Sequence, residues 1–192
     1  MVYNRECKKR VRVSAHIPRE KKEEITVKRF VYADNAATTP VSREVREAMA
    51  PCFETVWGNP SSLHQKGREA KVLLDDARLR IANVFHCTPR EIYFTSCGSE
   101  SDNWAIKGAA HRMKKKGRDE IVTTAIEHHA VLHACESLER EGFKVTYVGV
   151  DADGVVKMDE LRAAVTEKTA IVAVMYANNE IGTIEPIREI CD

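Results

Sequence analysis

Three clusters of polar residues in this chain have types and spacing suited to ligand chemistry. The first is the segment FTSCGSESDN at 94–103, which joins a short apolar run to a sequence with helical periodicity. A helix that begins just after a strand presents unpaired N–H groups and the positive end of its dipole, and so favours an anion. Gly98 permits close backbone approach, and Ser99 offers a hydroxyl donor. The segment fits a phosphate site or, alternatively, an ordinary capped helix start with Ser99 and Asp102 as a capping box.

The second cluster is the segment EHHAVLH at 127–133, and it has three interpretations. His129 and His133 are four residues apart and would share a helix face, as two ligands of a metal ion do, although no further ligands are identified. The histidines are alternatively solvated side chains at a helix start. In the third interpretation His128 lies at the carboxyl edge of a strand, where α/β sheets bind their ligands.

The third cluster is the segment YANNEIG at 176–182, again just after an apolar run. Asparagine amides in this position can bind a ring substituent or a carboxylate through a donor and an acceptor. The same residues are also typical of a plain turn. Because each of the three clusters follows a predicted strand, we expect them to converge on one edge of a sheet.

The elements that would position these clusters alternate along the chain. We expect strands at 92–95, 120–124, 144–150 and 170–176, and helices at 42–53, 63–85, 100–115, 130–140, 158–165 and 186–190. Strands that alternate with helices indicate an α/β fold with a mostly parallel sheet and flanking helices.

Composition excludes several classes of function. The 192 residues are 43% hydrophobic and 31% charged with a net charge of +1, a balance that does not indicate nucleic-acid binding. No apolar run approaches the roughly 20 residues of a membrane span. The six cysteines form no CxxC pair, so we expect no disulfide framework and a reducing cytoplasm. Residues 1–30 hold ten Lys or Arg and four Glu. They fit an RNA-contacting arm, a targeting peptide or a solvated leader, although their acids argue against a transit peptide.

Five segments together resemble the signature segments of one enzyme family. In chain order they are DNAATTP at 34–40, GNPSS at 58–62, FTSCGSESDN at 94–103, EHHAVL at 127–132 and NNEIG at 178–182. They resemble cysteine desulfurases, which belong to the class V aminotransferase group of fold type I pyridoxal-phosphate enzymes. The resemblance covers about residues 31–192. It implies that 31–62 contributes to the small domain and that 63–192 is the first half of the cofactor-binding large domain. Residues 1–30 lie outside the resemblance, and their composition indicates a basic leader of unknown role.

The resemblance also implies roles for individual residues toward pyridoxal 5′-phosphate. Gly98 and Ser99 match the turn that holds the cofactor phosphate. His128 matches the histidine that stacks on the pyridine ring and is proposed to move protons, and Asn179 matches the asparagine at the ring hydroxyl. Asn35 lies in the loop near the substrate carboxylate. The implied reaction converts L-cysteine to L-alanine and leaves persulfide sulfur on the enzyme for iron–sulfur cluster assembly.

The resemblance covers only part of a desulfurase. The family's Schiff-base lysine, the aspartate at the pyridine nitrogen and the mobile persulfide cysteine all lie in its second half, and family members are roughly twice as long as this chain. Cys97 stands where many relatives have glycine, and we do not assign it as the sulfur carrier. We therefore expect a truncated, inactive portion that requires a complementing C-terminal half.

Several alternatives stay open at this point. The chain would form a homodimer or associate with its complementing half, with an iron–sulfur scaffold protein as a further candidate partner. It is alternatively a non-catalytic scaffold, or a portion of another class V enzyme such as selenocysteine lyase. Half of a parallel sheet would leave a strand edge and apolar helix faces uncovered, so we also expect association.

Overall fold

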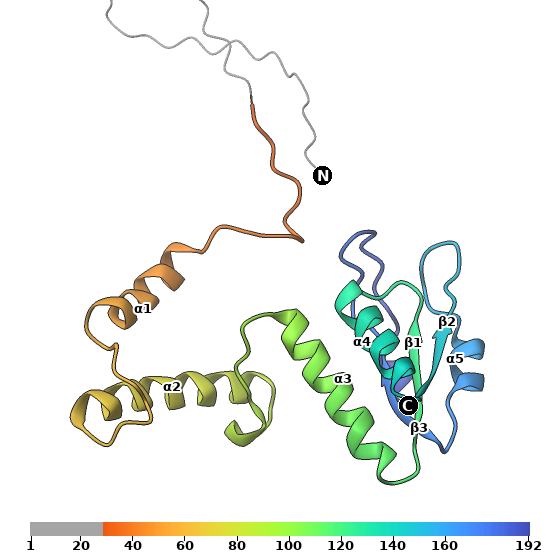
Figure 1. Cartoon of the computed structure of the whole chain (residues 1–192). Coiled ribbons are helices and arrows are strands. Elements are labelled where there is room, and N and C mark those ends of the chain that lie inside the picture. Colours follow the sequence, from red (N-terminus) through yellow and green to blue (C-terminus); the bar gives the residue numbers. More distant parts are fainter. Residues whose placement is uncertain (1–28) are drawn as a thin grey trace, which may run out of the picture. The chain divides into compact units, whose positions relative to one another are not determined.

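The computed structural model describes residues 29–192 (Figure 1). They divide into two units between Ser42 and Arg43. The described part of the first unit has no helix or strand; it contains a turn in which the Ala37 N–H donates to the Asp34 carbonyl over 3.2 Å. Residues 1–28 of the predicted basic leader lie outside the described residues, so the hypotheses on its role stay predictions.

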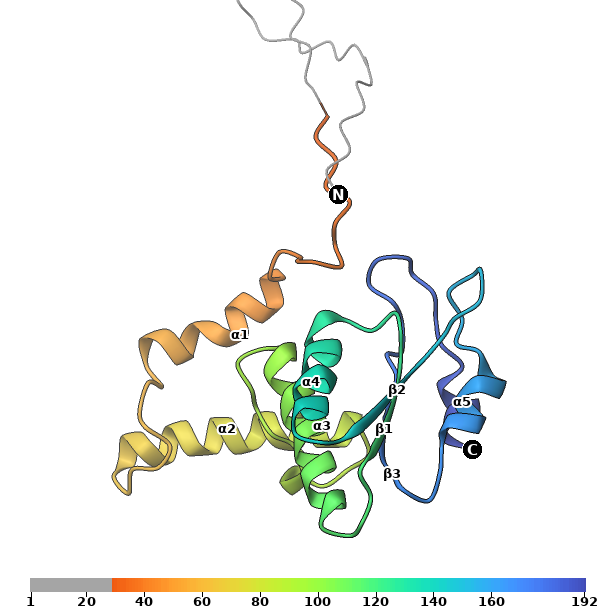
Figure 2. The ribbon, with the colours of Figure 1, turned by 45° about the vertical axis from the view of Figure 1, so that its right-hand side comes forward.

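A three-stranded parallel sheet forms the centre of the second unit (Figure 2). Its strands are β1 (Glu120–Thr124), β2 (Lys144–Val148) and β3 (Thr169–Ala173), in the order β2-β1-β3. In the register of the sheet, Ile121 of β1 is paired with Val145 on one side and with Ile171 on the other. The α/β class and the parallel sheet are therefore confirmed.

Helices cover both faces of this sheet (Figures 1 and 2). One face packs against α3 (Gly98–Lys114) and α4 (His129–Arg140). The other face packs against α5 (Met158–Ala164) and α6 (Ile187–Cys191). Strand β1 supplies both cores because its side chains alternate between the faces. Ile121 joins Leu138 in the first core, and Val122 joins Leu161 in the second.

Three further elements precede the sheet. They are α1 (Arg43–Glu54), α2 (Gln65–Val84) and the 3-10 helix η1 (Pro89–Glu91). The apolar stripes of α1 and α2 remain largely exposed: Phe53 is 74% accessible, and Val72 is 69% accessible. The sequence thus predicts the helices, whereas the surfaces that would cover their stripes are not among the described residues.

The strand predicted at 92–95 is wrong, because this segment has no strand hydrogen bonds. Tyr93 is 67% exposed and Phe94 is 46% exposed. A strand needs a neighbour to satisfy its backbone, and no strand in the described part of the chain pairs with this segment. Arg78 of α2 contacts it instead: its Nε donates to the Ile92 carbonyl over 3.3 Å, and its guanidinium lies 5.1 Å from the Phe94 ring centroid.

Two predicted strands end earlier than expected, and local contacts explain both. Beyond β2, Val150 pairs with Val156 in an isolated antiparallel bridge, so the chain has already turned. Beyond β3, the Met175 N–H donates to the side chain of Glu127 and not to a neighbouring strand.

Two further features concern the cysteines and the hydropathy of the helices. The five cysteines that the structure describes are all free thiols. Within residues 29–192, no helix combines the length and apolar character that crossing a bilayer requires.

Candidate functional site

The loops that follow β1 and β3 meet at the carboxyl edge of the sheet. These strands are parallel neighbours, so their loops leave the sheet on the same side. The amide Nδ2 of Asn178 in the second loop donates to the Ile126 carbonyl in the first over 2.9 Å. The structure therefore brings the second and third sequence clusters together, as their positions after the strands suggest.

Glu127 joins the same two loops through its side chain. It is 6% exposed, and its Oε1 accepts the Thr124 hydroxyl over 2.8 Å and the Met175 N–H over 2.9 Å. Burial raises the pKa of Glu127 above its usual range, although the two hydrogen bonds act in the opposite direction; the negative charge of Glu185 raises it further. This carboxyl group is thus held in place inside the protein and is not a solvated surface charge.

His128 combines a structural contact with an exposed ring. It is the N-cap of α4, where its Nδ1 accepts the Ala130 N–H over 3.0 Å. A neutral imidazole that accepts at Nδ1 carries its proton on Nε2. The cap therefore fixes both the ring and its tautomer, while the side chain stays open to solvent at the edge of the sheet.

The third cluster separates a buried asparagine from an exposed one. Asn178 is 8% exposed, and its Oδ1 accepts the N–H groups of Glu180 at 2.8 Å and Ile181 at 3.1 Å. Gly182 closes this turn with a φ of +79°, a conformation that favours glycine. Asn179 is exposed, and its side chain makes no hydrogen bond within the described part of the chain, so its amide is available to a ligand.

The start of α3 supplies an environment that stabilises negative charge. The helix begins at Gly98 with Cys97 as its N-cap, and both residues are exposed. A methyl group built on Gly98 would meet nothing within 4 Å, so the space beside it is open. The Glu100 N–H, followed by the Ser96 hydroxyl, lowers the pKa of the Cys97 thiol. The negative charge of Glu100 acts in the opposite direction. An exposed helix start with open space beside Gly98 is compatible with phosphate binding.

The capping box predicted between Ser99 and Asp102 is wrong. Because the helix already starts at Gly98, Ser99 lies inside its first turn and cannot cap it. The Glu100 carboxylate instead accepts the backbone N–H of Ser96 over 2.7 Å and its hydroxyl over 2.6 Å. The Ser99 hydroxyl is therefore not committed to the cap.

Asn103 connects the start of α3 with the start of α4. Its Nδ2 donates to the Ser99 carbonyl over 2.9 Å and makes a long hydrogen bond of 3.5 Å to the Ala130 carbonyl. The turn at Gly98 and Ser99 is therefore tied to the helix that His128 caps. The sequence motifs contain Asn103, Glu127 and Asn178, but the contacts that these side chains make between segments were not predicted from the sequence. The signal in the sequence was that Glu127 directly precedes His128 and that Asn178 directly precedes Asn179.

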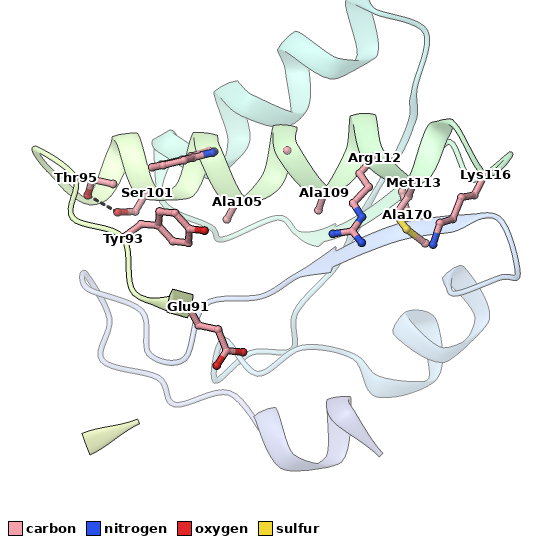
Figure 3. Close-up of a pocket in the computed structure, with 12 residues that line it drawn as sticks. Glu91, Tyr93, Thr95, Ser101, Ala105, Ala109, Arg112, Met113, Lys116 and Ala170 are labelled. Atoms are coloured by element: carbon pink, nitrogen blue, oxygen red, sulfur yellow. Dashed lines mark hydrogen bonds between the residues drawn. The ribbon is translucent and has the colours of Figure 1, made fainter. Parts of the chain in front are cut away.

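A separate open hollow of about 840 Å³ lies along α3 and β3 (Figure 3). Tyr93 and Trp104 line it in an edge-to-face contact with ring centroids 5.3 Å apart. Figure 3 also shows the hydroxyls of Thr95 and Ser101, whose oxygens are 2.6 Å apart. The lining includes none of the predicted site residues, so this hollow is not the predicted ligand site.

Two further predictions concern a metal ion and the substrate loop. The rings of His129 and His133 stack with centroids 5.6 Å apart, but residues 29–192 contain no group of three metal-ligating side chains placed around one point. The metal interpretation therefore lacks its further ligands. Asn35 lies in the first unit, exposed and in a turn, and its role at the substrate stays a prediction.

Known proteins resemble this chain over most of its length. Residues 31–192 match the family described as aminotransferase class-V. The chain belongs to the class-V aminotransferase family. Two relatives are the cysteine desulfurases IscS of Methanosarcina thermophila, 52% identical over 165 residues, and of Clostridium botulinum strain Hall, 52% identical over 160 residues. The alignments cover 86% and 83% of this chain but 41% and 40% of those proteins. The chain thus spans about two fifths of their length, and the predicted resemblance to cysteine desulfurases is confirmed.

Two solved structures share this fold. A NifS-like protein superposes with a TM-score of 0.79 at 46% identity. The superposition covers 82% of this chain and 43% of the NifS-like chain. A structure described as SspA in complex with cysteine superposes with a TM-score of 0.77 at 38% identity and covers 83% of this chain and 46% of its own. The α/β unit is therefore the corresponding portion of a desulfurase-like fold.

Proposed function

We propose that this chain forms the pyridoxal-phosphate-binding portion of a cysteine desulfurase. The observation that carries the proposal is the hydrogen-bonded edge of the sheet. It holds an anion-favouring helix start at Gly98 and Ser99, the oriented imidazole of His128 and the free amide of Asn179. These are the groups that a phosphorylated aromatic cofactor with a ring hydroxyl would need.

Each residue has a distinct part in this proposal. The N–H groups at Gly98 and Ser99, with the Ser99 hydroxyl, bind the phosphate. His128 stacks on the ring and holds a proton at Nε2, because its Nδ1 is occupied by the Ala130 N–H. Asn179 binds the ring hydroxyl, and Asn35 binds the substrate carboxylate. When bound, the cofactor supplies the electron sink for the chemistry at the amino acid.

The proposed reaction converts L-cysteine to L-alanine and transfers sulfur to an enzyme cysteine for iron–sulfur cluster assembly. A solved relative described as SspA in complex with cysteine supports this substrate. The chain spans 41% of its Methanosarcina relative, and we propose that the activity belongs to the full length of such a protein. We propose association with the remaining part of such a protein or as a homodimer, an iron–sulfur scaffold protein as further partner, and a cytoplasmic location.

Complementation tests this function. The chain is co-expressed with the segment of the Methanosarcina relative that follows the aligned region, and sulfide released from L-cysteine is measured with pyridoxal phosphate and a thiol reductant. We expect release that depends on both parts and falls when His128 is replaced by Ala. A stable complex that releases no sulfide would contradict catalysis and support the non-catalytic scaffold. Release of selenide from L-selenocysteine, without release of sulfide from L-cysteine, would support the selenocysteine lyase alternative.

A further inference from the structure

The backbone pairing of the sheet stops short of the proposed cofactor residues. The ladder between β1 and β3 ends at Thr123 and Ala173, whereas His128 lies five residues beyond the first and Asn179 six residues beyond the second. Two loops of this length have no fixed separation unless further contacts join them. The positions of the imidazole and the amide relative to each other therefore depend on bonds outside the ladder.

Side chains supply those bonds, and each comes from the residue just before a proposed ring contact. Glu127 precedes His128 and accepts the Met175 N–H of the other loop over 2.9 Å. Asn178 precedes Asn179 and donates to the Ile126 carbonyl of the other loop over 2.9 Å. Both side chains are buried, at 6% and 8% exposure, so water does not compete for these bonds.

Glu127 makes both of its hydrogen bonds to the loops through a single oxygen atom. Its Oε1 accepts the Thr124 hydroxyl at the end of β1 and the Met175 N–H after β3. Both bonds need an acceptor at the distance of a glutamate carboxyl, and neither needs a negative charge. A glutamine carbonyl at the same place would keep both bonds, whereas an aspartate is one methylene shorter and would keep its charge without this reach.

We infer that Glu127 is a positioning residue, which with Asn178 holds His128 and Asn179 at the separation that the cofactor ring requires. The inference rests on the proposed function, since the ring contacts of His128 and Asn179 belong to it. It predicts that geometry at Oε1 matters and that charge does not.

Four variants of the full chain separate these contributions. Glu127→Ala removes both bonds, Glu127→Asp shortens the side chain, and Glu127→Gln keeps the acceptor. The matched control is Glu120→Ala at the opposite end of β1, where Glu120 accepts the Thr166 hydroxyl over 2.6 Å and the Lys144 ammonium over 3.2 Å. Hydrogen exchange of peptides covering 125–130 and 174–182 reports on the two loops. Equilibrium dialysis of pyridoxine 5′-phosphate, which has no aldehyde to react with surface lysines, reports on the site.

We expect Glu127→Ala and Glu127→Asp to accelerate exchange in both loops and to weaken pyridoxine phosphate binding, each about tenfold, because both variants leave the donors of Thr124 and Met175 without their acceptor. Glu127→Gln and Glu120→Ala should remain within about threefold of the wild type. If Glu127→Ala does not fold, the aspartate and glutamine variants decide. The inference would be overturned if the 174–182 peptide of Glu127→Asp exchanged at the wild-type rate. It would also be overturned if this variant bound pyridoxine phosphate with the wild-type affinity. Failure of the wild-type chain to bind the probe would count against the proposed function, and exchange alone would then decide whether Glu127 joins the loops.

Discussion

At the scale of single residues, His128 links the stability of α4 to the proposed chemistry. Its Nδ1 caps the helix, and its ring faces solvent at the edge of the sheet. The cap leaves only Nε2 for a ligand or a proton. Folding of the helix start therefore sets the orientation of the ring before any ligand arrives.

Substitution separates the two parts of this residue. Asparagine is a strong N-cap, so we expect His128→Asn to keep the free energy of unfolding within about 0.5 kcal/mol of the wild type. His128→Ala loses the cap and should cost about 1 kcal/mol. Both variants lose the ring and should bind pyridoxine phosphate about tenfold more weakly. Urea unfolding and dialysis measure these effects, and wild-type binding by His128→Asn would refute the stacking role.

Cys97 reports on the anion-favouring turn. The Glu100 N–H and then the Ser96 hydroxyl lower its pKa, whereas burial raises the pKa of Cys135 to about 11. The thiolate is the reactive form, so at pH 7 iodoacetamide should modify Cys97 while Cys135 stays unmodified. Bound pyridoxal phosphate should slow the reaction at Cys97, with the exposed Cys191 as reference. Peptide mass spectra measure the modification rates. If the cofactor slowed the modification of Cys97 and of Cys191 equally, this would argue against cofactor binding at this turn.

At the scale of elements, the sheet depends on the packing of α4 against β1. Leu138 is fully buried in this core, whereas Leu79 of α2 is 46% exposed. We expect Leu138→Ala to lower the free energy of unfolding by about 3 kcal/mol, because it leaves a cavity. Leu79→Ala keeps a strong helix former and should change it by less than about 0.5 kcal/mol. Equal losses in urea unfolding would contradict this account of the core.

The same elements show what local pattern predicts and what it does not. The sequence predicts β1 at 120–124 and α4 to within one residue at its start, since both bury their apolar residues within the described chain. The run at 92–95 also consists of β-branched and aromatic residues that are typical of strands, yet it forms no strand because pairing depends on a neighbour.

Some candidate site residues could likewise be predicted from the sequence, whereas the contacts that position them could not. His128 and Asn179 were identified by their places after strands and by family resemblance. The bonds of Glu127 and Asn178 join loops about 50 residues apart, and periodicity carries no information on such contacts.

At the scale of the whole chain, exposed apolar side chains indicate association. Phe53, Val72 and Val84 on α1 and α2 are each more than two thirds exposed. Surfaces of this kind are usually covered in a folded protein. We expect the purified chain to self-associate in analytical ultracentrifugation, and to form a defined complex when co-expressed with the complementing segment of the Methanosarcina relative. A monomer that unfolds cooperatively would contradict this prediction.

The measurement that tests the central claim most directly is the visible absorption spectrum of the chain titrated with pyridoxal phosphate, before and after borohydride reduction. The account predicts saturable binding that dialysis reverses and that weakens in His128→Ala, with no lysine modified in stoichiometric yield. Cofactor trapped at a single lysine of this chain would contradict an incomplete site. The unchanged spectrum of free cofactor, together with failure to bind pyridoxine phosphate, would contradict the cofactor site itself.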